Sequence, residues 1–303
     1  MCGLRYFLYL ILIALFGATA PAANALNAHS IKHHGKARSY YTAYPAHQLT
    51  KNMPVVIVLH GGGGNGQNAA AMTGFDKLAV QEGFIAVFPD GNARGRMNLR
   101  TWNAKHCCAY AMKSQADDVG FLTAVIDDVV KRFDANADAV FMTGLSNGGM
   151  MTHHYAAARP DKLKAAAPVI SGLFGDEVMP HKAVPMLIIN SVLDKSIPVD
   201  GGHTGGRAKN QWDGTPLKPI SYQGAFWAAN NGCEVSGPNT TKYQLYQVDK
   251  FDCPINADVM HYITYDGGHS WPGGQKGTKR ADGPSEAFNA SSLIWSFFST
   301  YIE

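Results

Sequence analysis

The chain has 303 residues, of which 46% are hydrophobic and 16% charged, so it can bury a sizeable core and is not intrinsically disordered. The 26 basic and 23 acidic residues give a net charge of +3, and this near balance argues against a nucleic-acid-binding protein, which would carry a basic patch. No Pro/Ser/Thr-rich linker and no internal repeat divides the sequence.

The first 25 residues have the pattern of a secretory signal peptide. Arg5 provides a positive charge, residues 7–16 form an apolar run, and Ala23-Asn24-Ala25 fits a small-residue cleavage site. The apolar run is too short to cross a membrane, which needs about 20 apolar residues. We therefore expect a secreted protein, extracellular or periplasmic, with no membrane partner after cleavage and one catalytic domain over residues 26–303.

Strands and helices are expected to alternate along this domain. Continuous apolar runs predict strands buried on both faces, and apolar residues at helical spacing predict the helices between them. After antiparallel strands within residues 38–44, the expected strands are residues 55–59, 84–88, 139–143, 164–170, 185–190 and 259–265. The expected helices are residues 68–81, 117–133, 150–158, 220–230 and 285–301. This order predicts an α/β fold with a mostly parallel sheet, and the polar segment 200–219 is expected to be a long functional loop.

A glycine-rich loop, residues 60–64 (HGGGG), follows the first buried strand. A backbone N–H of this loop, most simply that of Gly62, could stabilise the oxyanion of an acyl-transfer reaction. The same loop also matches the dinucleotide-binding pattern G-x-G-x-x-G over residues 61–66, with Asp90 further on. We rank NAD binding below acyl transfer because NAD binding would leave the motifs around Ser146, Asp194 and His269 unexplained. Exported proteins also rarely encounter NAD. No cofactor is expected, and no zinc-binding motif is present in the sequence.

Residues 144–148 (GLSNG) match the nucleophile-elbow pattern G-x-S-x-G. The pattern alone is weak, but here a predicted strand precedes it and a predicted helix follows it. In that context the hydroxyl of Ser146 is expected at the carboxyl end of a strand, where open α/β sheets bind their ligands. The backbone N–H of Asn147, directly after the nucleophile, would be the second oxyanion donor.

A serine nucleophile needs a histidine base, and that histidine needs a carboxylate to orient it. In this fold class the acid and then the base follow the serine along the chain. Asp194 and His269 each come directly after a predicted strand, in this order. We favour Asp194 as the acid by its position, and Asp200 and Asp213 are its rivals.

These residues resemble the secreted polyhydroxybutyrate depolymerase and feruloyl esterase group of the α/β-hydrolases. The similar strings are HGGGGN (60–65), FPDG (88–91), TWNAKHCC (101–108), DDVGF (117–121), GLSNGGMM (144–151), FWAANNGC (226–233) and GGHSWPGG (267–274). The resemblance implies an α/β-hydrolase fold with helices on both faces of the sheet, a Ser146–Asp194–His269 triad, a backbone oxyanion hole and no metal. One departure is Asn190-Ser191, where such proteins usually carry His-Gly, which puts the local packing in doubt.

The expected activity is that of a carboxylesterase similar to polyhydroxybutyrate depolymerases, and its substrate is a small or oligomeric ester. A feruloyl or acetylxylan esterase is the alternative, and a peptidase would share the same machinery. An alternative of another class is a hydrolase-like protein that binds glycan or polyester without chemistry. Trp102, Trp212 and Trp271 could line the substrate pocket, although they could equally belong to the core.

Four cysteines remain after the expected signal peptide, and export permits disulfide bonds. We favour a bond between Cys233 and Cys253, which would join a helix end to a strand across a modest loop. A loop of this size is worth about 3 kcal/mol. Cys107 and Cys108 are adjacent in the sequence, and their redox state is left open.

Overall fold

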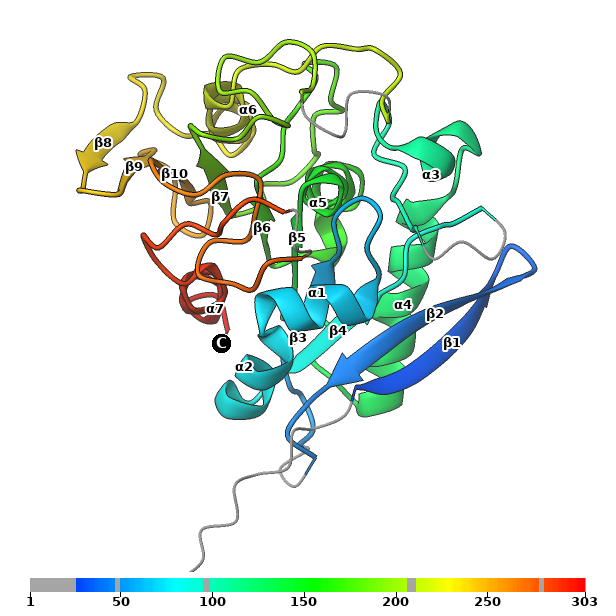
Figure 1. Ribbon diagram of the computed structural model, residues 1–303. Coiled ribbons are helices and arrows are strands. Elements are labelled where there is room, and N and C mark those ends of the chain that lie inside the picture. Colours follow the sequence, from blue (N-terminus) through cyan, green and yellow to red (C-terminus); the bar gives the residue numbers. More distant parts are fainter. Residues whose placement is uncertain (1–25, 47–49, 95–98, 206–210, 278–280, 303) are drawn as a thin grey trace, which may run out of the picture.

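A computed structural model describes residues 26–46, 50–94, 99–205, 211–277 and 281–302. The expected signal peptide lies outside the described residues. Within them the strands form one ten-stranded sheet (Figure 1). None of the described helices has the length and apolar character needed to cross a membrane.

The sheet has a parallel centre and an antiparallel pair at each edge. In spatial order its strands are β1 (Asn27–His33), β2 (Lys36–Ala43), β4 (Ile85–Pro89), β3 (Val55–Leu59), β5 (Val140–Leu145), β6 (Ala165–Val169), β7 (Met186–Ser191), β10 (Val259–Thr264), β9 (Tyr246–Lys250) and β8 (Asn239–Lys242). The six strands from β4 to β10 in this order run parallel, whereas β1–β2 and β9–β8 are antiparallel hairpins. This arrangement confirms the predicted mostly parallel α/β sheet.

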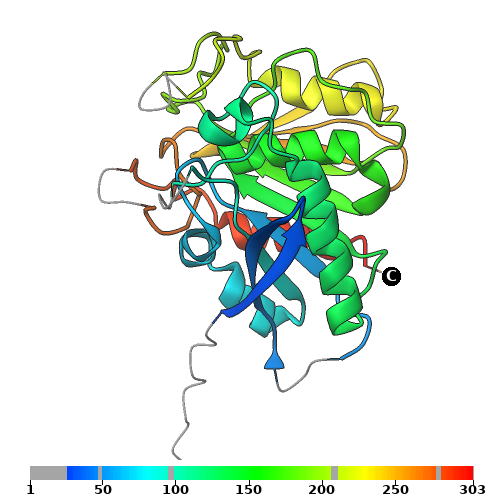
Figure 2. The ribbon, with the colours of Figure 1, turned by 90° about the vertical axis from the view of Figure 1, so that its right-hand side faces the viewer.

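Helices cover both faces of the sheet, which explains why its central strands are apolar on both sides (Figures 1 and 2). The helices are α1 (Gly66–Thr73), α2 (Phe75–Glu82), α3 (Ala109–Lys113), α4 (Asp118–Phe133), α5 (Asn147–Ala158), α6 (Ser221–Asn230) and α7 (Ala290–Ser299). One core cluster packs α4, α5 and α6 against the sheet, and the other packs α1, α2 and α7 against the opposite face. The predicted helices on both faces of the sheet are thereby confirmed.

The structure corrects several predicted elements. The helix expected over residues 68–81 is interrupted at Gly74, whose φ of 71° ends α1 and starts α2. The last helix starts later than expected, because the side chain of Asn289 caps it by accepting a hydrogen bond from the Ser292 N–H. The antiparallel strands expected within residues 38–44 are instead β1 and β2, and only β2 overlaps the expected range. The sequence also did not predict α3, β8 or β9, because these elements are short and β8 is exposed along its whole length.

Both cysteine pairs form disulfides. The predicted bond between Cys233 and Cys253 joins the end of α6 to the segment that follows β9. Cys107 and Cys108, whose state the sequence left open, form a vicinal disulfide immediately before α3. The second disulfide lies next to the candidate active site.

Candidate active site

Ser146 lies in a sharp turn between β5 and α5, with φ 56° and ψ −120°. This left-handed φ is uncommon for a residue with a side chain and indicates strain at a functional position. The glycines on either side allow the turn to pack tightly. A Cβ on Gly144 would lie 2.6 Å from the Gly148 carbonyl oxygen, and one on Gly148 would lie 2.5 Å from that of His60. The sequence therefore folds locally as a nucleophile elbow.

The three residues of the predicted triad meet at the carboxyl ends of their strands. The Ser146 hydroxyl lies 2.8 Å from His269 Nε2, and His269 Nδ1 lies 2.8 Å from Asp194 Oδ2. Because a carboxylate only accepts hydrogen bonds, Nδ1 of the neutral imidazole carries the proton and donates it to Asp194. Nε2 is then the acceptor for the serine O–H, which is the geometry that general-base activation of a serine requires.

The carboxylate of Asp194 is buried and held on both of its oxygens. Oδ1 accepts hydrogen bonds from the backbone N–H groups of Ser196 and Ile197, which leaves Oδ2 for His269. Among the described contacts the rival acids do not reach that imidazole. Asp213 instead bonds His106 Nδ1 at 2.7 Å, and Asp200 is exposed.

Two residues that line the cavity at Ser146 offer backbone N–H groups as candidate oxyanion donors. Gly62 and Asn147 both line the cavity at Ser146, and a Cβ on Gly62 would lie 3.7 Å from the Asn147 Cβ. Neither N–H has an acceptor among the turn, loop and cap hydrogen bonds of the described residues. Asn147 is also the first residue of α5, where backbone N–H groups have no partner within the helix. The pair can therefore bind a developing oxyanion.

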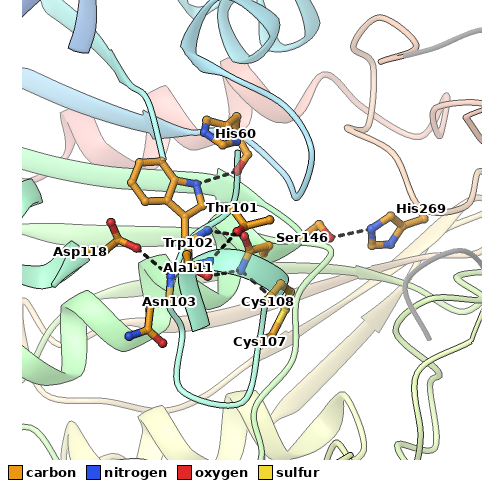
Figure 3. Close-up of a disulfide and its surroundings, with 11 residues drawn as sticks. His60, Thr101, Trp102, Asn103, Cys107, Cys108, Ala111, Asp118, Ser146 and His269 are labelled. Atoms are coloured by element: carbon orange, nitrogen blue, oxygen red, sulfur yellow. Dashed lines mark hydrogen bonds between the residues drawn. A yellow bond between two sulfur atoms is a disulfide. The ribbon is translucent and has the colours of Figure 1, made fainter. Parts of the chain in front are cut away.

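The side chain of Asn147 joins the elbow to a neighbouring loop. Its Oδ1 accepts from the Trp102 backbone N–H at 2.7 Å, and its Nδ2 donates to the Trp102 carbonyl at 3.0 Å and lies 3.6 Å from Cys107 Sγ. The Trp102 indole N–H donates in turn to the carbonyl of His60 (Figure 3). One tryptophan thus joins both loops that supply candidate oxyanion donors, and sequence reasoning missed this role.

His60 supports the glycine-rich loop as a neutral, buried side chain. Its Nδ1 donates to the Gly61 carbonyl, and its Nε2 accepts from the Gly91 N–H. Burial lowers the pKa of His60 to about 4, so the ring stays uncharged near neutral pH. Asp90, the acidic residue of the dinucleotide pattern, is also buried and accepts from the Gly66 N–H. It therefore holds the first residue of α1 against the end of β4, which gives the pattern a structural explanation.

The triad opens into a cavity of about 500 Å³. This volume is within the range of small-molecule sites. Its walls include apolar side chains, one aromatic ring and two charged groups, one directly after Asp194 and one beside the histidine loop: Leu99, Cys108, Ala109, Ile197, Trp212, Lys195 and Asp282. Asp282 accepts a hydrogen bond from the backbone N–H of His269 and so helps to hold the histidine loop.

Of the three tryptophans predicted at the substrate pocket, only Trp212 lines the cavity. The prediction is wrong for Trp102 and Trp271, because both side chains are fully buried in the core. The Trp102 ring packs beside the ring of His60, and the Trp271 indole N–H donates to Ser291 Oγ on α7. The sequence alone does not indicate whether a tryptophan next to a motif lies in the core or in the pocket.

Asn190-Ser191, which stands where the resembling family usually carries His-Gly, belongs to a buried polar network. Asn190 Oδ1 accepts from His261 Nε2 and from Gln223 Nε2, and Gln223 Oε1 accepts from His153 Nε2. The Ser191 hydroxyl donates to the carbonyl of Gly267 and so connects the acid loop to the histidine loop. The local packing that the sequence left in doubt therefore satisfies its polar groups.

The mostly parallel sheet carries a strand–serine–helix elbow, and an acid and a histidine follow the ends of later strands. This arrangement defines an α/β-hydrolase. Residues 38–200, more than half of the chain, match the family model described as esterase PHB depolymerase. The chain belongs to this family and is a carboxylic ester hydrolase. The match includes Ser146 and Asp194 and ends before His269.

Three proteins to which the chain is similar carry esterase names. The chain is 27% identical over 256 residues to the putative esterase NocK of Nocardia uniformis subsp. tsuyamanensis, covering 79% of this chain and 72% of NocK. It is 26% identical over 240 residues to feruloyl esterase B of Piromyces equi, covering 75% of this chain but only 41% of that protein's length. The structure of an acetyl xylan esterase from Aspergillus awamori aligns with a TM-score of 0.58 at 18% identity over 80% of this chain and 94% of that one, which is a likeness of fold.

Proposed function

We propose that residues 26–303 form the catalytic domain of a secreted serine carboxylesterase that acts through a covalent acyl-enzyme. The observation that carries the proposal is the continuous hydrogen-bonded path from Ser146 through His269 to Asp194. The signal-like pattern of residues 1–25 supports export, and two disulfides fit an oxidising compartment.

In the proposed mechanism each group has one task. His269 takes the hydroxyl proton of Ser146 as its oxygen attacks the ester carbonyl, while Asp194 holds the imidazole and stabilises its positive charge. The N–H groups of Gly62 and Asn147 bind the oxyanion. His269 then protonates the leaving alcohol. Water, deprotonated by the same imidazole, hydrolyses the acyl-serine and releases the acid.

The proposed substrates are small or oligomeric esters, such as hydroxybutyrate oligomers, which fit the cavity volume and its apolar walls. A second candidate is a feruloyl or acetyl ester on a plant polysaccharide. It is favoured by the likeness to feruloyl esterase B and by the aromatic ring of Trp212 in the cavity wall. The two candidates differ in whether the cavity receives an aliphatic or an aromatic acyl group.

The nucleophile is tested by the Ser146→Ala variant with p-nitrophenyl butyrate. We expect a folded protein whose turnover falls by about 10⁴-fold or more, because the attacking oxygen is gone. A matched control is Ser292→Ala at the exposed start of α7, which should keep full turnover. Near-full activity of Ser146→Ala would place the nucleophile elsewhere, and an inactive wild-type protein would favour the non-catalytic glycan- or polyester-binding alternative.

A substrate panel of hydroxybutyrate oligomers, methyl ferulate and acetylated xylan separates the candidate acyl groups. We expect the highest kcat/KM on the hydroxybutyrate oligomers. A preference for methyl ferulate that is lost in Trp212→Ala would instead support the feruloyl esterase alternative. Hydrolysis of peptide amides as fast as esters would support a peptidase.

A further inference from the structure

The β1–β2 hairpin packs on α4 (Figures 1 and 2). At the turn of this hairpin lies a second cluster of side chains that could bind a ligand. His33 is the last residue of β1, His34 follows it in the turn, and Asp117 is the residue that caps α4. None of the three lines the cavity at Ser146. They line a separate surface cavity of about 780 Å³.

The potential ligand atoms of this cluster converge on one point. His33 Nε2 and His34 Nε2 lie 3.1 Å and 2.9 Å from the same oxygen of Asp117, Oδ2. All three atoms lie within 4.8 Å of one another. Tetrahedral zinc with bonds of 2.0–2.2 Å separates its ligand atoms by about 3.3 Å. The two histidine–carboxylate distances therefore need to open by a few tenths of an ångström to admit an ion, and the two imidazole nitrogens, which lie within 4.8 Å of each other, adjust to the same separation.

We propose that His33, His34 and Asp117 form a binding site for a divalent transition-metal ion such as Zn²⁺, with solvent in the remaining position. Two imidazole nitrogens and one carboxylate oxygen are ligands that such ions prefer, whereas Mg²⁺ and Ca²⁺ prefer oxygen ligands. Since His34 is mostly exposed and Asp117 half exposed, the ion can enter from solvent. Asp117 Oδ1 keeps its bond to the Gly120 N–H, which leaves Oδ2 as the ligand and fixes the carboxylate.

The bound ion would connect the hairpin to the start of α4. A neighbouring ion pair already joins the same two elements, because Arg38 on β2 lies 2.7 Å from Asp118 on α4. Asp118 also accepts a hydrogen bond from the Asn103 N–H, on the loop that carries Trp102. The metal site would therefore stabilise the fold at this edge of the sheet, and it has no part in the ester chemistry.

The site is tested by titrating ZnCl₂ into the chelator-treated protein by isothermal calorimetry at pH 7.5. We expect one ion to bind per chain and to raise the melting temperature. His34→Ala removes a ligand, and Asp117→Asn removes the carboxylate while keeping a side chain that can cap α4. Each should bind at least about tenfold more weakly and lose the zinc-dependent rise in melting temperature.

The matched controls are His181→Ala and His203→Ala, which remove exposed histidines elsewhere on the surface. Both variants should bind zinc as the wild type does. Absence of stoichiometric zinc binding by the wild type would overturn the proposal, as would binding that His34→Ala leaves unchanged. Ester hydrolysis is measured separately and should be the same in His34→Ala as in the wild type, so failure of this proposal leaves the proposed catalytic function intact.

Discussion

At the scale of single residues, the carboxylate of Asp194 decides which nitrogen of His269 carries the proton. In Asp194→Asn the two backbone bonds from Ser196 and Ile197 can persist on the amide oxygen, but the amide nitrogen then faces His269 Nδ1 and can only donate. The imidazole would shift its proton to Nε2, which could no longer accept from Ser146.

We therefore expect Asp194→Asn to lower kcat by about 10³- to 10⁴-fold with little change in melting temperature. The measurement is steady-state hydrolysis of p-nitrophenyl butyrate together with a thermal unfolding curve. Asp200→Asn, a change at the exposed rival acid, is the matched control and should retain wild-type turnover. Equal activity of the Asp194 and Asp200 variants would show that Asp194 does not orient the base.

The sequence predicted the candidate triad because each of its members follows a buried strand within a short motif. It could not reveal the packing of Trp102 and Trp271, because a tryptophan beside a motif can face either the core or a pocket. The meeting of His33 and His34 with Asp117 was also invisible, since it depends on how a hairpin docks on a helix more than 80 residues away. Local patterns predict elements and order, whereas contacts between distant elements require the folded structure.

At the scale of elements, α5, α6, β7 and β10 are joined by the buried network around Gln223. This side chain on α6 accepts from His153 on α5 and donates to Asn190 on β7 and to the Ser171 carbonyl. The Trp227 indole N–H donates to His153 Nδ1, which fixes the proton of that ring on Nε2. Each polar group depends on its neighbours, so loss of one member leaves others buried without a partner.

We expect Gln223→Leu to destabilise the protein by about 2 kcal/mol, because it leaves the buried His153 N–H without an acceptor, whereas the Ser171 carbonyl keeps its bond from Asn190 Nδ2. Urea unfolding at pH 7.5 measures the change. Gln81→Leu, at an exposed position on α2, should alter the unfolding free energy by less than about 0.5 kcal/mol. A cost for Gln223→Leu no larger than for Gln81→Leu would contradict the proposed importance of the network.

At the scale of the whole molecule, buried neutral histidines make stability depend on pH. Burial lowers the pKa of His60 to about 4 and the pKa values of His153 and His261 to about 3. In the unfolded chain these rings titrate near pH 6.5, so below that pH the unfolded state binds protons that the native state excludes. Their contribution is therefore fully present above about pH 6.5 and is lost progressively as the pH falls towards 4 and 3.

Between pH 7.5 and 5.5 the three rings together should lower the free energy of unfolding by about 4 kcal/mol, in roughly equal shares. Urea unfolding at the two pH values measures this loss. His261→Gln, which keeps a donor for Asn190, should reduce the loss by about a third, whereas His181→Ala at the surface should leave it unchanged. Equal stability at both pH values would contradict the assignment of neutral buried rings.

In the proposed mechanism one hydroxyl, activated by one imidazole, carries the acyl group. The most direct measurement is mass spectrometry of the protein after reaction with a fluorophosphonate, followed by peptide mapping. We predict a single adduct on Ser146, formed rapidly by the wild type, far more slowly by His269→Ala, and absent from Ser146→Ala. An adduct on another residue, or a wild-type protein that does not react, would contradict the account.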